Sequence, residues 1–232
     1  MTGTFERCAS VPDAFAELVA EELAAGTTTL FLSGGTLAAD CYRALAARHT
    51  SGVQPTSDWS AVDVYYGDER CVPLDNQDSN HLLAATTLLD VVGPVHSDHP
   101  MYESGPPDKA AAAYQNEVAD LPDFGLVHLG LGPDGHTASL FPESPALAVD
   151  EPGLFVVANH DPLGHNVHDR ITLTLAGIAR ARLVVFTVTG ADKNELLARL
   201  LGGEDLPAGR VTAAEVRWLV DDQAAGSLDL PR

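Results

Sequence analysis

Residues 129–142 read LGLGPDGHTASLFP and directly continue the apolar run FGLVHL. Asp134 stands two residues before His136 in this glycine-rich loop, and two hydroxyl side chains follow. A hydrophobic core does not need these polar groups at the end of a buried strand, whereas a site that moves protons on a small ligand does. Because ligands of open α/β sheets bind beyond the carboxyl ends of the strands, this stretch predicts an α/β fold with a site after the strand.

Strand-like and helix-like segments alternate on both sides of this stretch. Short apolar runs predict buried strands, and apolar residues spaced three and four apart predict helices. Such alternation predicts an α/β fold with a largely parallel sheet that is covered on both faces. The predicted strands are 27–35 (ending in a glycine turn), 59–66, 124–132, 154–159, 170–175, 182–188 and the start of 216–225, and the predicted helices are 36–49, 79–90, 106–121, 191–201 and the end of 216–225.

The sequence predicts a single domain over residues 1–232. Residues 92–109 are the best candidate for a linker, but strand–helix alternation continues on both sides of them, so we expect a surface loop there. Ser79 is the expected N-cap of the helix that follows it.

The composition of the 232 residues excludes several classes of protein. The formal net charge is −20, whereas nucleic-acid binding needs a basic footprint, so no nucleic-acid partner is expected. No apolar run approaches the roughly 18 residues that span a bilayer, and the amino-terminal residues lack a signal-peptide pattern, so no membrane partner is expected. The three cysteines are odd in number and have no C-x-x-C spacing, which argues against disulfides and thiolate zinc sites and favours a reducing cytoplasm.

The acidity also limits how an anionic ligand could bind, because local cations must overcome a repulsive background. The chain has only two lysines, Lys109 and Lys193. Lys193 falls in the first turn of the predicted helix 191–201, where it opposes the helix dipole unless an anion lies between them. For Lys193, as for Arg170 at the start of its strand, a ligand contact and a solvated charge remain equal alternatives.

Gly130, Gly132 and Gly135 match the dinucleotide fingerprint G-x-G-x-x-G. A true fingerprint opens a long helix and is followed about 20 residues later by an acidic residue at a strand end. Pro142 and Pro145 leave room for barely two helical turns, and no suitable acidic residue follows. The match is therefore interpreted as accidental, and no cofactor is expected.

Two further turns carry candidate ligand contacts. Gly34, Gly35 and Thr36 join a strand to a helix, which suits either a bound phosphate at the helix N-terminus or an ordinary capped turn. Asp68 and Arg70 follow the strand 59–66; the arginine could clamp a phosphate or carboxylate, with Asp68 and its neighbour Glu69 holding the guanidinium in place. The alternative is a solvated ion pair worth roughly 0–1 kcal/mol.

Histidines supply the candidates for proton transfer and for metal binding. His136, beside Asp134, suits general acid–base chemistry near neutral pH, and the alternative is a histidine that only holds its loop together. His160, His165 and His168 lie in one loop, but their spacing matches no common zinc pattern, so no metal is expected.

With these residues assembled, the chain resembles the 6-phosphogluconolactonases of the glucosamine-6-phosphate isomerase/6-phosphogluconolactonase family. The matching segments are LFLSGGT, VYYGDERCVPLDNQDSN, LGLGPDGHTASLFP and RITLTLAGIARARLVVFTVTGADKNELL, and WLVDDQAA resembles the C-terminal end of the family. Two segments depart from the family pattern: SGGTLA stands where SGGSTP is common, and GHNVHD replaces a loop that is often rich in proline and lysine.

The resemblance implies a three-layer α/β/α sandwich with a mainly parallel, Rossmann-like sheet. It also implies hydrolysis of 6-phospho-D-glucono-1,5-lactone to 6-phosphogluconate in the oxidative pentose phosphate pathway, without a required metal. It also implies that His136 is the general base, that Arg70 and Lys193 lie near the phosphate and that Arg170 lies in the site. Asp134 would orient the His136 ring.

Two alternatives remain open at this point. A glucosamine-6-phosphate deaminase-like isomerase would use a carboxylate base, for which Asp68 is the candidate, and an assay for ammonia release would separate the two activities. A non-enzymatic sugar-phosphate sensor would keep the cations without needing His136, but no basic recognition helix is visible. The expected partner is a small sugar-phosphate lactone bound by a monomer.

Overall fold

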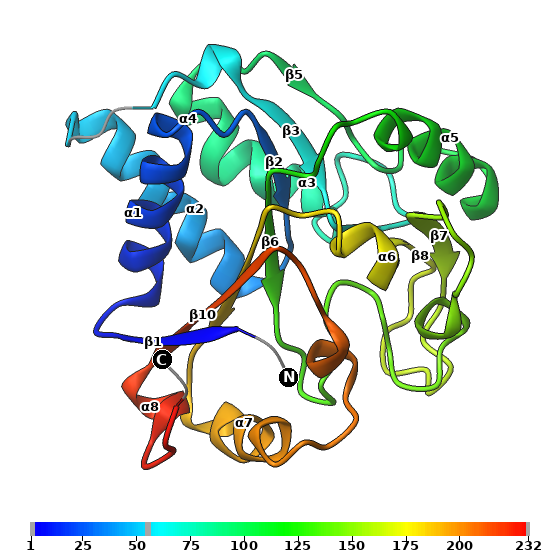
Figure 1. The fold of residues 1–232 in the computed structure, drawn as a ribbon. Coiled ribbons are helices and arrows are strands. Elements are labelled where there is room, and N and C mark those ends of the chain that lie inside the picture. Colours follow the sequence, from blue (N-terminus) through cyan, green and yellow to red (C-terminus); the bar gives the residue numbers. More distant parts are fainter. Residues whose placement is uncertain (1–2, 54–56, 231–232) are drawn as a thin grey trace.

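The computed structural model describes residues 3–53 and 57–230. Within them, a seven-stranded sheet with the order β1-β10-β9-β6-β2-β3-β5 forms the centre of the molecule (Figure 1). Neighbouring strands run parallel throughout, which confirms the predicted fold class. The strands are β1 (Thr4–Cys8), β10 (Glu215–Asp221), β9 (Leu183–Val188), β6 (Leu126–Gly130), β2 (Thr29–Leu32), β3 (Asp63–Tyr66) and β5 (Ser97–Asp98).

Helices flank this sheet (Figure 1). Ser79 is the N-cap of α3, as predicted, because its hydroxyl accepts a hydrogen bond from the Leu82 amide. A π-helical turn over 85–89 then connects α3 to α4. The helices are α1 (Val11–Ala24), α2 (Thr36–Ser51), α3 (Asn80–Ala84), α4 (Asp90–Val92), α5 (Pro107–Ala119), α6 (Leu175–Ile178), α7 (Asn194–Leu201) and α8 (Asp222–Ala225).

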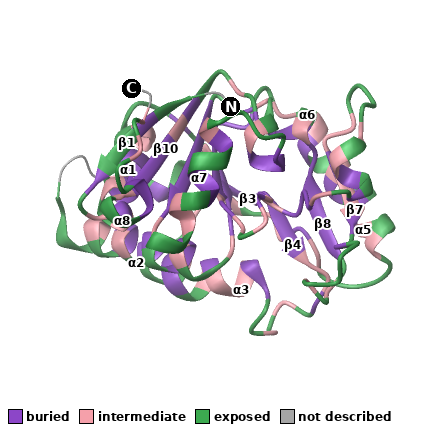
Figure 2. Ribbon diagram, turned by 90° about the horizontal axis from the view of Figure 1, so that it is seen from below, coloured by how far each residue is buried: buried purple, intermediate pink, exposed green. Residues whose placement is uncertain are grey.

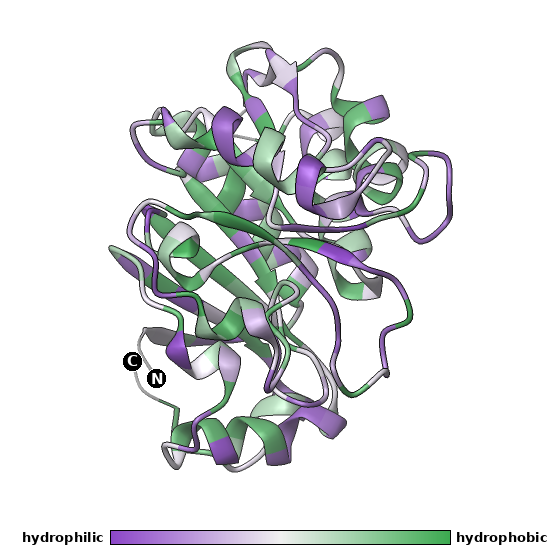
Figure 3. Ribbon diagram, turned by 90° about the vertical axis from the view of Figure 1, so that its right-hand side faces the viewer, coloured by the Kyte–Doolittle hydropathy of each residue, from purple (hydrophilic) through white to green (hydrophobic). Residues whose placement is uncertain are grey.

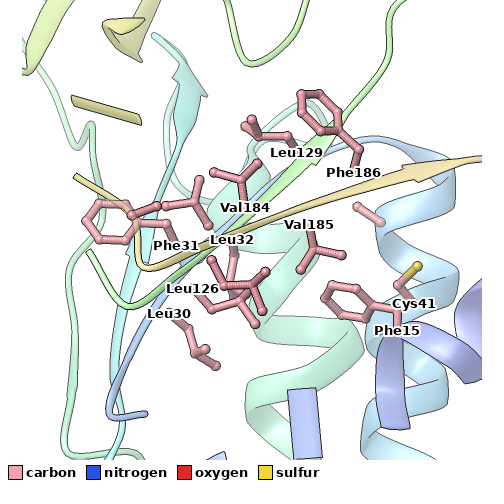
Figure 4. Close-up of a cluster of buried hydrophobic side chains, with 14 of the residues drawn as sticks. Phe15, Leu30, Phe31, Leu32, Cys41, Leu126, Leu129, Val184, Val185 and Phe186 are labelled. Atoms are coloured by element: carbon pink, nitrogen blue, oxygen red, sulfur yellow. The ribbon is translucent and has the colours of Figure 1, made fainter. Parts of the chain in front are cut away.

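The core lies on both faces of the central strands. All six residues of β9 are buried, as expected for a parallel strand that is covered on both sides. The Phe186 ring stacks on Trp218 at 3.8 Å, and the Phe31 ring stacks on Phe124 at 4.5 Å. Figure 4 shows Phe31 and Phe186 within the apolar cluster that β2, β6 and β9 share. Strands of the central sheet are accordingly largely green, that is hydrophobic, in Figure 3.

Three segments differ from the sequence-based expectation. Residues 59–61 form a 3₁₀ turn rather than strand, because the Asp58 carboxylate accepts a hydrogen bond from the Ser60 amide. The first strand and helix, β1 and α1, were not predicted, although the N-cap Ser10 and the proline after it mark the helix start. The candidate linker 92–109 contributes the edge strand β5. The single domain over residues 1–232 stays a prediction, and residues 1–2 and 231–232 at its ends lie outside the described residues.

A second, antiparallel sheet with the order β4-β8-β7 was not foreseen. It consists of β4 (Asp68–Arg70), β8 (Arg170–Leu173) and β7 (Val156–Asn159). Only Gly67 separates β3 from β4, so the small sheet begins where a central strand ends. Figure 2 shows β4 and β8 largely buried beside β3. This attachment brings the predicted strand 170–175 to the carboxyl edge of the central sheet.

Among the described helices, none combines the length and the apolar character that crossing a membrane requires.

Candidate active site

A cavity of about 630 Å³ opens at the carboxyl edge of the central sheet. The segments after β2, β6 and β9 line it together with β4 and β8. In the strand order, β3 is the neighbour of β2 in one direction, while β6 and β9 follow in the other direction. The cavity therefore lies where the strand order reverses, which is the crevice where ligands of such sheets bind. All predicted site residues except Asp134 line it: Gly34, Gly35, Thr36, Asp68, Arg70, His136, Arg170 and Lys193.

Asp134 reaches the cavity through His136. Its Oδ1 atom lies 2.5 Å from Nδ1 of the His136 ring and also accepts a hydrogen bond from the His136 amide at 3.1 Å. A Cβ at Gly132 would lie 2.2 Å from the same ring, so only glycine allows the loop to pack this closely under the imidazole. The bond to Asp134 occupies Nδ1 and leaves Nε2 as the ring nitrogen available to a ligand.

The electrostatics of this pair favour a charged carboxylate. Burial by itself would raise the pKa of Asp134, but the hydrogen bond and the charge of His136 outweigh it and lower the pKa below its ordinary value. An ionised Asp134 holds a proton on Nδ1 of His136, and Nε2 is then the unprotonated nitrogen that can accept one. The local geometry therefore suits a general base.

The Gly34–Gly35 turn presents the start of α2 to the cavity. Gly35 is the N-cap residue, has φ +97° and provides no side-chain cap, so the first backbone N–H groups of α2 lack the usual capping hydroxyl. Thr36 is the first helical residue rather than the cap. The positive end of this long helix thus faces the same space as His136.

Two arginines lie opposite each other in the small sheet. Arg70 of β4 pairs directly with Arg170 of β8, an arrangement of like charges that is unfavourable without an anion. The Arg70 guanidinium donates to the Asp78 carbonyl at 2.5 Å. Arg170 is only 5% exposed, its Nη1 atom finds no hydrogen-bond partner among the described residues, and burial lowers its pKa although the nearby Asp68 charge opposes this shift.

The expectation that Asp68 and Glu69 hold the Arg70 guanidinium is wrong. Glu69 is 1% exposed and accepts hydrogen bonds from the backbone of Arg70 and from the start of α3. Asp68 instead accepts a hydrogen bond from the Ser139 hydroxyl at 2.6 Å and one from Nδ2 of the Asn80 side chain at 3.2 Å. Glu69 points to the opposite face of β4 from Arg70, whereas Asp68 shares the face of Arg70 but is held by other partners.

Lys193 completes the cationic lining of the cavity. It lies at the end of a short 3₁₀ turn (Ala191–Lys193) and is the N-cap residue of α7, slightly before the predicted helical position. Its ammonium group is 3.9 Å from the Asp192 carboxylate, and its side chain is 17% exposed.

The loop after β7, residues 160–169, contributes Asn166 to the lining of the cavity and an ion pair at its edge. His168 pairs with Asp78 at 2.9 Å, while Asn166 lines the cavity. In the part of the chain that the structure describes, no three or more histidine, cysteine or acidic side chains are grouped so that they could hold a metal ion. His160 and His165 are therefore not part of such a group.

A family model described as "Glucosamine-6-phosphate isomerases/6-phosphogluconolactonase" matches residues 5–220 of the chain. The chain belongs to this family. A 6-phosphogluconolactonase from Synechocystis sp. is 38% identical over 218 residues, which cover 88% of this chain and 85% of the relative. One from Mycobacterium tuberculosis is 37% identical over 198 residues, with coverage of 78% and 79%.

Solved structures of the same family agree with this assignment. The crystal structure of a 6-phosphogluconolactonase from Thermotoga maritima has a TM-score of 0.82 and 26% sequence identity, and the match covers 95% of this chain and 100% of that chain. The resemblance drawn from the sequence motifs is thereby confirmed.

In this member of the glucosamine-6-phosphate isomerase/6-phosphogluconolactonase family, the cavity also contains polar residues that the sequence analysis did not single out. Asn80 and the fully buried His128 and Thr187 belong to its lining. Asn80 lies inside a motif that carried the resemblance, but nothing local distinguishes it from its neighbours. His128 lies within the apolar run FGLVHL, where the presence of a single histidine is the only sequence feature that could have indicated a polar contact.

Proposed function

We propose that the chain hydrolyses 6-phospho-D-glucono-1,5-lactone to 6-phospho-D-gluconate in the oxidative pentose phosphate pathway. The observation that carries this function is that His136, hydrogen-bonded to Asp134, lines one cavity together with three cationic side chains. A phosphorylated lactone needs a base near its carbonyl carbon and an anion-binding group at its far end. The similarity to 6-phosphogluconolactonases supports the same substrate.

At the carbonyl end, Nε2 of His136 removes a proton from a water molecule, which attacks the lactone carbon and forms a tetrahedral oxyanion. Collapse of this intermediate breaks the bond to the ring oxygen, which takes the proton back from His136. Asp134 keeps the ring oriented and stabilises the imidazolium that forms between the two steps. Such acid–base catalysis contributes about 10²–10⁴-fold, and no covalent intermediate is required.

At the other end, Arg70, Arg170 and Lys193 bind the phosphate. A dianionic phosphate between the two arginines removes the like-charge repulsion across β4 and β8, and an arginine fork matches its oxygens well. Asp68, which Ser139 and Asn80 hold in a fixed orientation, accepts hydrogen bonds from sugar hydroxyls. Binding energy from these remote contacts fixes the carbonyl against His136.

The Asp68 carboxylate is also the feature that a deaminase of the same family would use as its base. The two functions are separated by assaying the purified protein with freshly generated lactone and with glucosamine 6-phosphate. We expect lactone opening well above the spontaneous rate and no ammonia from the amino sugar. Ammonia release with only the spontaneous rate of lactone opening would reverse the assignment.

Replacing Arg170 by methionine tests the phosphate end. The change removes charge-assisted hydrogen bonds to the substrate, so KM should rise about 10- to 100-fold with little change in kcat. The melting temperature should stay constant or rise, because a buried donor without a partner among the described residues disappears. Arg43→Met on the exposed side of α2 is the matched control. An unchanged KM for the Arg170 variant would remove this residue from the phosphate site.

The enzyme acts as a monomeric single-domain protein in the cytoplasm. Its three cysteines, Cys8, Cys41 and Cys71, are all free, which fits a reducing compartment.

A further inference from the structure

A buried hydrogen-bond chain borders the cavity and takes no part in the proposed chemistry. Nδ1 of His128 lies 3.0 Å from the Tyr42 hydroxyl, and Nε2 lies 2.9 Å from Oγ1 of Thr187. All three side chains are almost completely buried. The imidazole also packs on the Phe15 ring of α1, 4.3 Å away between ring centroids. His128, on the central strand β6, therefore connects Tyr42 of α2 to Thr187 of β9.

The Tyr42 end of the chain holds the turn that lines the cavity. The Ser33 amide donates to the Tyr42 hydroxyl at 2.6 Å, and the same hydroxyl lies 3.1 Å from the Ser33 carbonyl. β2 ends at Leu32, so at Ser33 the main chain has left the sheet. The Tyr42 hydroxyl replaces the neighbouring strand as hydrogen-bond partner, one residue before the Gly34–Gly35 turn.

The Thr187 end of the chain lies near the opposite side of the same cavity. Thr187 is the next-to-last residue of β9, which leads into the segment that carries Lys193. Thr187 lines the cavity. The hydrogen-bond chain thus connects the turn that presents the start of α2 with the strand that leads to one of the cations.

The protonation state of His128 makes the chain independent of pH near neutrality. Burial lowers the pKa of His128 to about 3, so the ring is neutral, with one nitrogen donating and the other accepting. The hydroxyls of Tyr42 and Thr187 can each donate or accept, so both tautomers of His128 satisfy the chain.

We propose that His128 is a positioning residue: through Tyr42 it sets the placement of the Ser33–Gly35 turn relative to β9, and thereby the affinity of the cavity for the phosphorylated substrate. This role rests on the proposed lactone hydrolysis but uses no atom of His128 in the reaction. A histidine that merely satisfies itself in the core would affect stability alone, so the two roles differ in what they change.

His128→Leu tests this role, because leucine fills a similar volume without either hydrogen bond. We expect KM for the lactone to rise about tenfold, the factor that corresponds to about one lost hydrogen bond, with kcat little changed. The dissociation constant of the product, measured by calorimetry, should rise by the same factor. His128→Asn keeps a polar atom near the Nδ1 position and should restore KM, whereas His128→Gln keeps only the contact with Thr187 and should not.

Tyr42→Phe provides an independent measurement of the same chain. It removes the hydroxyl, keeps the ring and should raise KM as His128→Leu does. The double variant should be no worse than either single variant, because both changes break one chain. Phe15→Leu is the matched control: it loosens packing around the His128 ring without touching a hydrogen bond, so it should lower the melting temperature and leave KM unchanged.

A wild-type KM and product affinity in folded His128→Leu would overturn the positioning role, as would an equal KM increase in Phe15→Leu. If the Leu variant does not fold, the Asn–Gln pair decides the question by the same comparison. If the wild-type protein fails to open the lactone, the proposed function fails separately, and the affinities of the same variants for inorganic phosphate then test the positioning of the turn.

Discussion

Replacing His136 by asparagine should lower kcat for lactone opening by about 10²- to 10⁴-fold. Asparagine keeps a polar side chain of similar reach but cannot take a proton from water at neutral pH. The phosphate-binding residues Arg70, Arg170 and Lys193 are untouched, so the affinity for the product should change little. Stopped-flow kinetics, corrected for the spontaneous hydrolysis of the lactone, measure kcat, and calorimetry with 6-phosphogluconate measures the affinity for the product.

A matched control for this prediction is His96→Asn. His96 also pairs with an aspartate, Asp63, through Nδ1 at 2.6 Å, but Asp63 is the first residue of β3 and lies at the opposite end of the strand from the cavity. This variant should retain wild-type kcat. If His136→Asn retained it as well, another group would have to be the base.

Replacing Glu69 by alanine should lower the free energy of unfolding by about 3–5 kcal/mol. The Glu69 carboxylate accepts four hydrogen bonds, from the amides of Arg70 at 2.7 Å, Asn80 at 2.8 Å and His81 at 2.8 Å and from the Ser79 hydroxyl at 3.0 Å. Each buried donor left unpaired costs about 1–3 kcal/mol, and water that enters the space satisfies some of them. Urea unfolding followed by circular dichroism measures the loss.

Glu69→Gln is the conservative comparison, and Glu17→Ala is the control. Glutamine keeps the size but turns an NH₂ group toward groups that donate, so it should recover only part of the stability. Glu17 is exposed on α1, and its replacement should change stability by no more than about 0.5 kcal/mol. An unfolding midpoint for Glu69→Ala equal to that of the wild type would show that α3 and β4 are held together by other contacts.

The prediction for Glu69 also shows where sequence reasoning reached its limit. Adjacent charges of opposite sign in Asp68–Glu69–Arg70 indicated an ion pair, but Glu69 points to the opposite face of β4 from Arg70 and accepts hydrogen bonds from the start of α3. Asp68 shares a face with Arg70 but is held by the Ser139 hydroxyl, while Arg70 donates to the Asp78 carbonyl. Which face each side chain takes depends on the small antiparallel sheet, and no local pattern announced that sheet.

The inner strands β2, β3, β6 and β9 were predictable because each is a short, largely apolar run that is almost entirely buried, whereas the edge strands β1 and β5 are not. Residues 59–61 were wrongly predicted as the start of a strand because the sequence continues from Trp59 into the apolar residues of β3. Trp59 is indeed buried, but its backbone follows the Asp58 cap into a 3₁₀ turn. The pairing of Asp134 with His136 was likewise accessible, since two residues in one tight loop meet without any help from the rest of the fold.

The sequence alone determined the α/β architecture, the family and the local pair that carries the proposed base. Tertiary structure decided the remainder of the site: Arg70 meets Arg170, Asp68 meets Ser139, and Tyr42 reaches Thr187 through His128. The physical reason is the separation along the chain over which each kind of interaction acts. Strand and turn preferences act over a few neighbouring residues, whereas these contacts join segments far apart in the chain, and their geometry follows from strand order and register, which local periodicity does not specify.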